Sequence, residues 1–145
     1  MTSGGKNMPK EMISSTEARE QAFVLLFEKS FNEELEADKI YELALESEAI
    51  KASDFTAKLF EETCNKMPVL DDYITKYAKG WNLSRISKVS LAILRLAICE
   101  MRYFDKTPVG VSINEAVNLC KKYASEDEYT FVNGLLGTFA REECK

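Results

Sequence analysis

Apolar residues recur every three or four positions along most of this chain, which is the spacing of one face of an α-helix. The first such segment, with Ala18, Ala22, Leu25 and Leu26 on one face, is predicted to begin at Ser14 or Ser15. A serine there is followed three residues later by a glutamate, and this spacing satisfies free backbone N–H groups at a helix start. The same reasoning predicts helices over about 36–49, 53–67, 70–78, 88–104, 112–123 and 125–142.

The segment from about 88 to 104 is apolar around nearly its whole circumference, which is typical of a helix at the centre of a fold. Pro68 and Gly80 stand where helices are expected to end, and no segment alternates in the manner of a strand. We therefore expect an all-α protein of about seven helices in two small packed bundles. Residues 14–145 should form one domain, preceded by a flexible tail over residues 1–13.

Composition changes this picture little. No apolar run reaches the ~18–20 residues that span a bilayer, and the polar start of the chain lacks the apolar core of a signal peptide. The four cysteines are scattered and form no CxxC pair. These features predict a cytoplasmic protein without a membrane segment or a metal site.

The chemistry available to this chain favours binding over catalysis. There is no histidine, so the commonest general base and every nucleophile pair that depends on it are missing. There is no glycine-rich phosphate loop, and the paired carboxylates lie on polar helix faces. We expect neither an enzyme nor a cofactor.

The charges are unevenly distributed. Residues 28–62 hold four bases and eleven acids, net −7, whereas residues 76–123 hold nine bases and three acids, net +6. The basic segment ends in Lys121 and Lys122 and is followed by Phe131 and Asn133. Lysines can hold phosphates, an exposed ring can stack on a base, and an amide can bond a base edge. The alternative is that the basic residues lie on an ordinary solvated face and that Phe131 packs in the core.

Two further groups of charged residues are candidates for ligand binding, and the second admits two interpretations. Lys6, Lys10 and Arg19 make a weakly basic N-terminal arm that acidic residues dilute. Arg95 and Glu100 interrupt the central apolar helix, where an unpaired buried charge is costly. Either they form a surface for a protein partner, or they reach solvent or cap a neighbouring helix.

Motifs in a fixed order along residues 16–140 resemble the NusB family of transcription antitermination factors. They read Ala-Arg-Glu at 18–20, Trp-Asn-Leu-Ser-Arg-Ile at 81–86, Ile-Leu-Arg-Leu-Ala-Ile-Cys-Glu at 93–100, Ile-Asn-Glu-Ala-Val at 113–117 and Phe-Val-Asn-Gly at 131–134. The resemblance implies two small helical bundles and a protein partner, the small-subunit ribosomal protein NusE. It also implies an RNA ligand, the boxA element of ribosomal RNA leader transcripts, and a place in the RNA polymerase antitermination complex.

The resemblance also assigns residues to two surfaces. With the basic residues above, the RNA-binding set is Lys6, Lys10, Arg19, Lys121, Lys122, Asp127, Phe131 and Asn133. The partner-binding set is Phe27, Arg95 and Glu100. Family members often carry consecutive arginines where this chain has residues 12–17, so we expect the partner to supply part of the basic surface. A protein-only module or homodimer is the alternative function.

Overall fold

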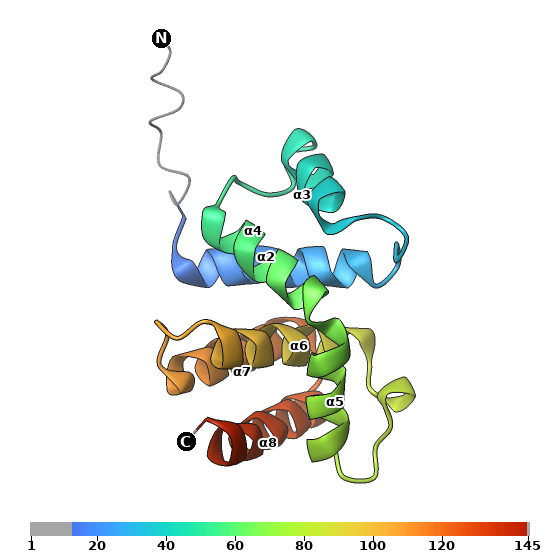
Figure 1. Ribbon diagram of the computed structural model, residues 1–145, viewed down its shortest axis with the longest axis vertical. Helices are drawn as coiled ribbons and strands as arrows, with labels where there is room; N and C mark the ends of the chain where they lie inside the picture. The colour runs from blue at the N-terminus through green and yellow to red at the C-terminus, as the bar shows by residue number, and fades with distance from the viewer. Residues whose placement is uncertain (1–12, 145) are drawn as a thin grey trace.

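The computed structural model describes residues 13–144, and every regular element in that range is helical (Figure 1). Residues 1–12, with the predicted tail and the candidate bases Lys6 and Lys10, lie outside the described residues. The elements are α2 (Ser15–Lys29), α3 (Ala37–Glu46), α4 (Asp54–Asn65), α5 (Met67–Tyr77), the short 3-10 helix η1 (Leu83–Arg85), α6 (Lys88–Tyr103), α7 (Val109–Tyr123) and α8 (Glu126–Glu143).

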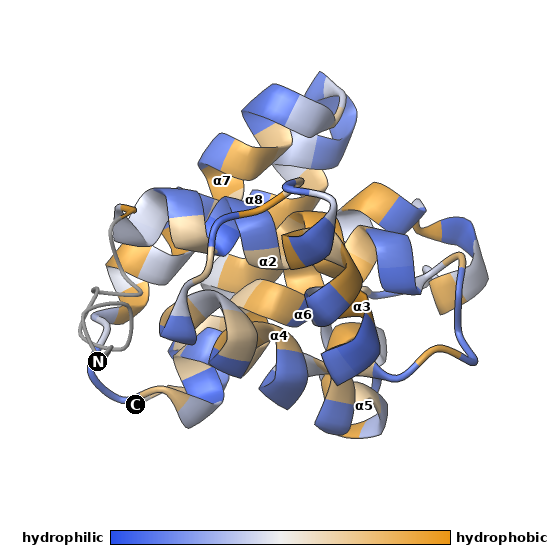
Figure 2. Cartoon of the chain, turned by 90° about the horizontal axis from the view of Figure 1, so that it is seen from above, coloured by the Kyte–Doolittle hydropathy of each residue, from blue (hydrophilic) through white to orange (hydrophobic). Residues whose placement is uncertain are grey.

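The helices form two small bundles that share α6. One consists of α2, α3 and α4, and the other of α5, α7 and α8 around α6 (Figure 1). Helix α6 packs against α2, α4, α5, α7 and α8, which agrees with its apolar circumference. Apolar residues face inward on the surrounding helices, whose outer faces are polar (Figure 2). The predicted all-α class, the number of helices and the two bundles are thus confirmed.

Serine side chains begin four of the helices. Ser14, Ser53, Ser87 and Ser125 each accept a hydrogen bond from the backbone N–H three residues ahead. At Ser125 the side chain of Glu128 also accepts from the serine N–H, which completes the reciprocal box predicted there. These caps explain why the predicted starts of α2 and α8 are correct.

Two predicted helix starts are three residues late: α5 begins at Met67, with Pro68 in its first turn rather than at the end of α4, and α7 begins before Ser112. The serine–glutamate spacing at Ser112 and Glu115 suggested a cap, but α7 begins at Val109 with Pro108 before it. Proline is suited to this place because its fixed φ favours a helix start and a free N–H is not needed. Ser112 is instead buried in the helix, and its hydroxyl has no hydrogen-bond partner among the described residues.

Candidate nucleic-acid interface

Arg19 and Glu100, assigned from the sequence to an RNA-binding arm and a partner-binding face, contact each other inside the protein. They lie on α2 and α6 and are 6% and 2% exposed. Arg19 Nε donates to Glu100 Oε1 at 2.9 Å, and Nη2 donates to Oε2 at 2.6 Å. This placement corrects the expectation that both charges lie on the surface.

Other groups complete the surroundings of Arg19. Glu115 on α7 lies 3.5 Å from Nη1 and accepts a hydrogen bond from Thr16 Oγ1 at 2.7 Å. The guanidinium carbon lies 5.2 Å from the ring centroid of Phe55 on α4. The hydrogen bond to Glu100 raises the pKa of Arg19, so the guanidinium keeps its charge. This buried cluster ties α2, α4, α6 and α7 together.

Arg95 also has a partner, but it stays partly open. Its Nε donates to Asp71 Oδ1 at 2.7 Å and its Nη2 to Oδ2 at 3.0 Å, which links α6 to α5. The side chains of Arg95 and Asp71 are 19% and 22% exposed. Arg95 can therefore contribute to a surface while Asp71 holds its orientation.

Lys121 and Lys122, the bases predicted near RNA, lie at the end of α7, where the neighbouring ring is Tyr129 and not the predicted Phe131. Lys121 Nζ lies 5.6 Å from the ring centroid of Tyr129, and both residues line a shallow groove beside α8. Asn133 is exposed one helical turn beyond Tyr129. The Lys121 ammonium beside the Tyr129 ring, together with the exposed amide of Asn133, suits contact with an RNA phosphate and a nucleobase at the same time.

A second groove on α8 holds Phe131. The Phe131 ring is half-buried and lies 5.8 Å from the ring of Trp81, which is 50% exposed. Arg85 and Asp127 line the same groove. Phe131 is thus neither free in solvent nor in the core, and it forms an aromatic pair at the surface.

Trp81 and Arg85 are the residues that sequence reasoning missed. They lie in the connector between α5 and α6, and such a connector shows no helical periodicity to reveal which side chains meet. Their presence in a motif shared with the resembling family was the only available indication. We name the following set the α8 surface: Trp81, Arg85, Lys121, Lys122, Asp127, Tyr129, Phe131 and Asn133.

Glu20 on α2 pairs with Lys122 at the edge of the α8 surface. Glu20 Oε2 lies 2.5 Å from Lys122 Nζ and accepts a short hydrogen bond from the hydroxyl of Tyr123. These hydrogen bonds lower the pKa of Glu20 and raise that of Lys122. Lys122, expected to meet phosphate, therefore already has an anionic partner.

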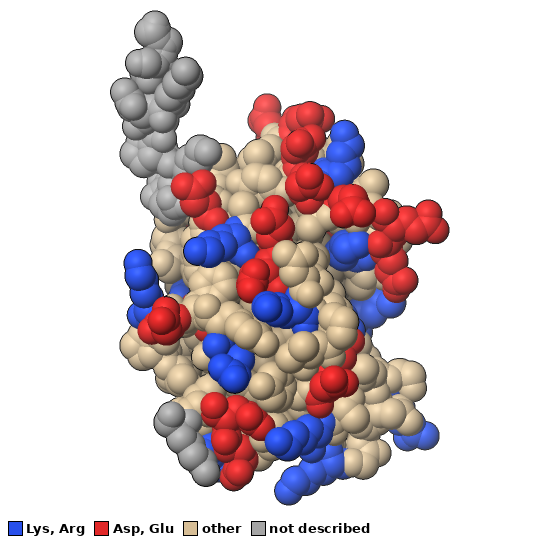
Figure 3. Space-filling view, viewed as in Figure 1, with Lys and Arg blue, Asp and Glu red and all other residues tan. Residues whose placement is uncertain are grey.

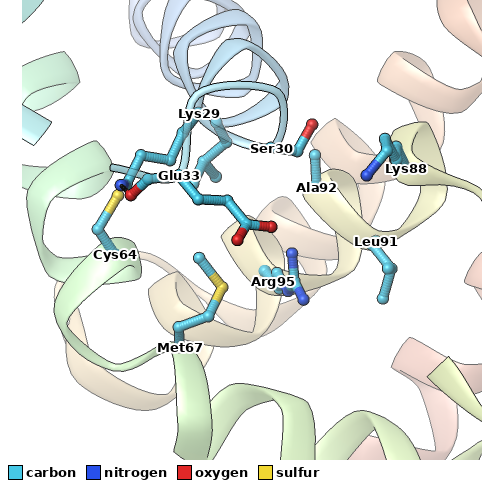
Figure 4. Close-up of a pocket in the computed structure, with 10 residues that line it drawn as sticks. Lys29, Ser30, Glu33, Cys64, Met67, Lys88, Leu91, Ala92 and Arg95 are labelled. Carbon is cyan, nitrogen blue, oxygen red and sulfur yellow. Dashed lines mark hydrogen bonds between the residues drawn. The ribbon is translucent and has the colours of Figure 1, made fainter. Parts of the chain in front are cut away.

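Arg95, predicted to bind a partner, lines a separate pocket of about 350 Å³, whereas Phe27, predicted with it, is not among the lining residues. In Figure 4, Glu33 and Arg95 point toward each other across this pocket, and Lys88 stands at its edge. Phe27 packs under Phe31 at 5.1 Å between ring centroids. The lining residues are Leu26, Lys29, Ser30, Glu33, Cys64, Met67, Lys88, Leu91, Ala92 and Arg95, and we call this the Arg95 pocket.

Ordered contacts hold the rim of the Arg95 pocket in place. Lys29 Nζ donates to the backbone carbonyls of Glu33 at 2.6 Å and Leu35 at 2.8 Å, which ties the loop after α2 to that helix. Lys88 Nζ lies 5.3 Å from the ring centroid of Phe31, which is 61% exposed. Aromatic residues such as Phe31 are enriched in protein-binding surfaces relative to the rest of the surface.

Acidic residues outnumber basic ones on the first bundle. Acidic side chains gather over α3 and the adjoining end of α2, with few bases among them (Figure 3). Except for Lys29 on α2, the bases of the α8 surface and of the Arg95 pocket lie on or beside the other bundle, around α6. An anionic ligand is therefore expected to approach the C-terminal bundle.

No grouping of cysteine, aspartate and glutamate side chains within residues 13–144 could hold a metal ion. Burial raises the pKa of Cys64 and of Cys120 to about 11, so these thiols stay protonated at neutral pH. Over the same residues, no helix has both the length and the apolar character needed to cross a membrane.

Residues 16–141 match the NusB family. The transcription antitermination protein NusB of Ruminiclostridium cellulolyticum is 40% identical over 126 residues, which cover 86% of each chain. NusB of T. maritima superposes with a TM-score of 0.79 at 27% identity, covering 92% of this chain and 96% of that one. A second similar structure is the NusB chain solved with NusE and double-stranded RNA, with a TM-score of 0.77, 26% identity and coverage of 87% and 95%. The chain belongs to the NusB family.

Proposed function

We propose that this protein is a transcription antitermination factor that binds boxA-type RNA and NusE without catalysing a reaction itself. The observation that carries the proposal is the α8 surface, where the exposed Trp81 ring pairs with the half-buried Phe131 ring in a groove that Arg85 also lines, on a NusB-family fold. A NusB relative has been solved with NusE and double-stranded RNA, which supports both ligands for this chain. The role places the protein in the cytoplasm, within the RNA polymerase antitermination complex.

In the proposed RNA complex, the rings of Trp81 and Phe131 stack on bases while Arg85 and Lys121 meet phosphates. Single-stranded RNA offers unstacked bases that aromatic side chains can cover. Asp127 lines the same groove as the two rings, and its negative charge opposes phosphate there. Asp127 lies in the first turn of α8, where a negative charge interacts favourably with the helix dipole. This interaction explains why the Asp127 charge is tolerated.

Replacing either ring should weaken RNA binding while the fold survives. Phe131→Leu and Trp81→Leu keep an apolar side chain at a surface position but remove the flat face. Each should reduce RNA affinity by about 1–3 kcal/mol, the usual value of one base–aromatic stack. Gel shifts with a boxA RNA, in the presence of NusE, measure this loss. Asp127→Asn should act in the opposite direction and tighten binding.

Tyr103→Leu is the matched control for these variants. Tyr103 is 36% exposed at the last turn of α6, the end of that helix away from the Trp81 connector. It should leave RNA affinity unchanged. If Phe131→Leu lowered the melting temperature and left the RNA affinity of the folded protein unchanged, Phe131 would have only a packing role.

We propose that NusE binds at the Arg95 pocket. Three features support this site: an exposed ring at Phe31, a base at Lys88, and an arginine whose direction is fixed by Asp71. Aromatic and arginine side chains are enriched among the residues that dominate protein interfaces. Glu100 is assigned an indirect role, because its carboxylate lies in the interior with Arg19.

Phe31→Ser should weaken NusE binding about tenfold or more, equivalent to roughly 1.4 kcal/mol. The variant removes an exposed ring and leaves Phe27 beneath it, so the melting temperature should stay the same. Leu43→Ser is the control, since Leu43 is 43% exposed on α3, outside the Arg95 pocket. Isothermal calorimetry with purified NusE gives both affinities. Equal affinities for the two variants would exclude Phe31, beside the Arg95 pocket, from the NusE-binding site.

The homodimer alternative is tested by light scattering after size-exclusion chromatography. A monomer that forms a one-to-one complex with NusE and then shifts boxA RNA is the expected result. A stable dimer that binds neither ligand would instead favour the protein-only function. A salt series in the gel shift separates phosphate contacts from stacking, because only the former depend strongly on salt.

A further inference from the structure

We infer that Glu20 is a built-in competitor of RNA phosphate, occupying the phosphate position on Lys122 and Tyr123 until RNA displaces it. This inference rests on the proposed RNA-binding function. Glu20 then sets how tightly this edge of the α8 surface accepts RNA, whatever the RNA sequence. Glu20 lies on α2 and was not among the residues that the sequence assigned to RNA binding.

The geometry places two donors on a single oxygen. Lys122 Nζ and the Tyr123 hydroxyl both donate to Oε2 of Glu20, the lysine at 2.5 Å. The Tyr123 ring packs on Phe23 with centroids 4.9 Å apart, so its hydroxyl is directed toward α2. A cationic ammonium and a phenolic O–H converging on one point are a donor set that suits a phosphate oxygen.

The contact is open enough to exchange. The side chains of Lys122 and Glu20 are 61% and 26% exposed, unlike the buried pair of Arg19 and Glu100. An exposed ion pair contributes little to stability, because water and salt already screen it. A phosphate can therefore replace the carboxylate at small expense to the fold, whereas the buried pair cannot be exchanged in this way.

The carboxylate has two opposing effects on RNA. It holds Lys122 and Tyr123 in place, and it also neutralises one base that would otherwise attract phosphate. Glu20 repels any phosphate near Lys122, and rotation of the Glu20 side chain away from Lys122 is enough to relieve this repulsion. Since both donors remain when the carboxylate swings away, removal of its charge should favour RNA overall.

Glu20→Gln tests this inference because the amide oxygen can still accept both hydrogen bonds without the charge. The variant should bind single-stranded boxA RNA more tightly in the presence of NusE, with an unchanged melting temperature. One additional phosphate contact also steepens the salt dependence, so the gain should be about threefold larger at 50 mM than at 200 mM salt. An RNA of equal length and unrelated sequence should gain by a similar factor, because phosphate contacts are independent of sequence.

Glu17→Gln is the matched control. Glu17 is exposed one helical turn before Glu20, changes the net charge equally, and forms no ion pair within the described residues. Its RNA affinity should stay near that of the parent protein. In Glu20→Gln/Lys122→Gln the gain should vanish, because the released base is missing.

The outcomes separate this inference from the function on which it rests. If the parent protein and every variant failed to bind RNA with NusE present, the proposed function would be overturned, and this inference with it. If the parent protein bound RNA and Glu20→Gln bound it equally or more weakly, Glu20 would be a positioning residue and only this inference would be overturned. A gain equal to that of Glu17→Gln would reduce the effect to net charge and overturn it as well.

Discussion

Glu100→Leu should lower the free energy of unfolding by about 3–5 kcal/mol, the cost of leaving one member of a buried ion pair without its partner. Arg19 would remain in the interior, with Glu115 at 3.5 Å as its remaining ion-pair partner among the described residues. Glu100→Lys should be at least as harmful, since it would place a second positive charge against Arg19. Urea denaturation followed by circular dichroism measures the loss.

The double variant Arg19→Met/Glu100→Leu gives the decisive comparison. It removes both charges and keeps apolar volume, and methionine can still pack against Phe55. Such replacements of buried ion pairs are often neutral, so the double variant should be far more stable than Glu100→Leu alone. Asp71→Leu, which breaks the more exposed pair with Arg95, should cause a smaller loss than Glu100→Leu. If Glu100→Leu were as stable as the parent protein, the buried pair would not be the link between the helices that we describe.

The fold could be predicted because its determinants are local. The apolar circumference of residues 88–104 predicted a central helix, and α6 (Lys88–Tyr103) is that helix. The serine caps placed the starts of α2 and α8. The error at Ser112 arose because serine and glutamate three apart occur inside helices as well as before them, and proline decided the true start.

The candidate surfaces could be predicted only in part, because charge pairing between distant residues is not visible in a sequence. Arg19 and Glu100 are separated by 81 positions and Glu20 and Lys122 by 102. From the sequence, each arginine or lysine in these pairs counts as a free base. The fold shows instead that one base is buried in a structural cluster and another is held by a carboxylate at the surface.

The buried Arg19–Glu100 pair and the surface Glu20–Lys122 pair start from adjacent residues of α2. Arg19 faces inward and fixes α2 against α6 and α7, whereas Glu20, the next residue, faces α7 from outside. Adjacent helix positions point about 100° apart, so one short motif can serve packing and ligand binding at once. The Ala-Arg-Glu motif at 18–20 therefore combines a buried alanine, a structural arginine and a glutamate that contacts Lys122 at the edge of the α8 surface.

Leu94→Ala should lower the free energy of unfolding by about 2–5 kcal/mol, because Leu94 is fully buried on α6 and the lost side chain would leave a cavity. Leu43→Ala is the matched control, since the same side chain is 43% exposed on α3 and its removal should have a much smaller effect. Equal losses at the two positions would contradict the central place of α6.

The same experiment tests whether the two bundles unfold together. Helix α6 packs against helices of both bundles, so weakening it should destabilise the whole domain in one transition. The single tryptophan, Trp81, reports on the connector before α6, whereas circular dichroism reports on all helices. In Leu94→Ala the two probes should shift to lower urea by the same amount and stay coincident. If fluorescence changed well before or after the helical signal, the bundles would unfold separately, and α6 would belong to one of them rather than to both.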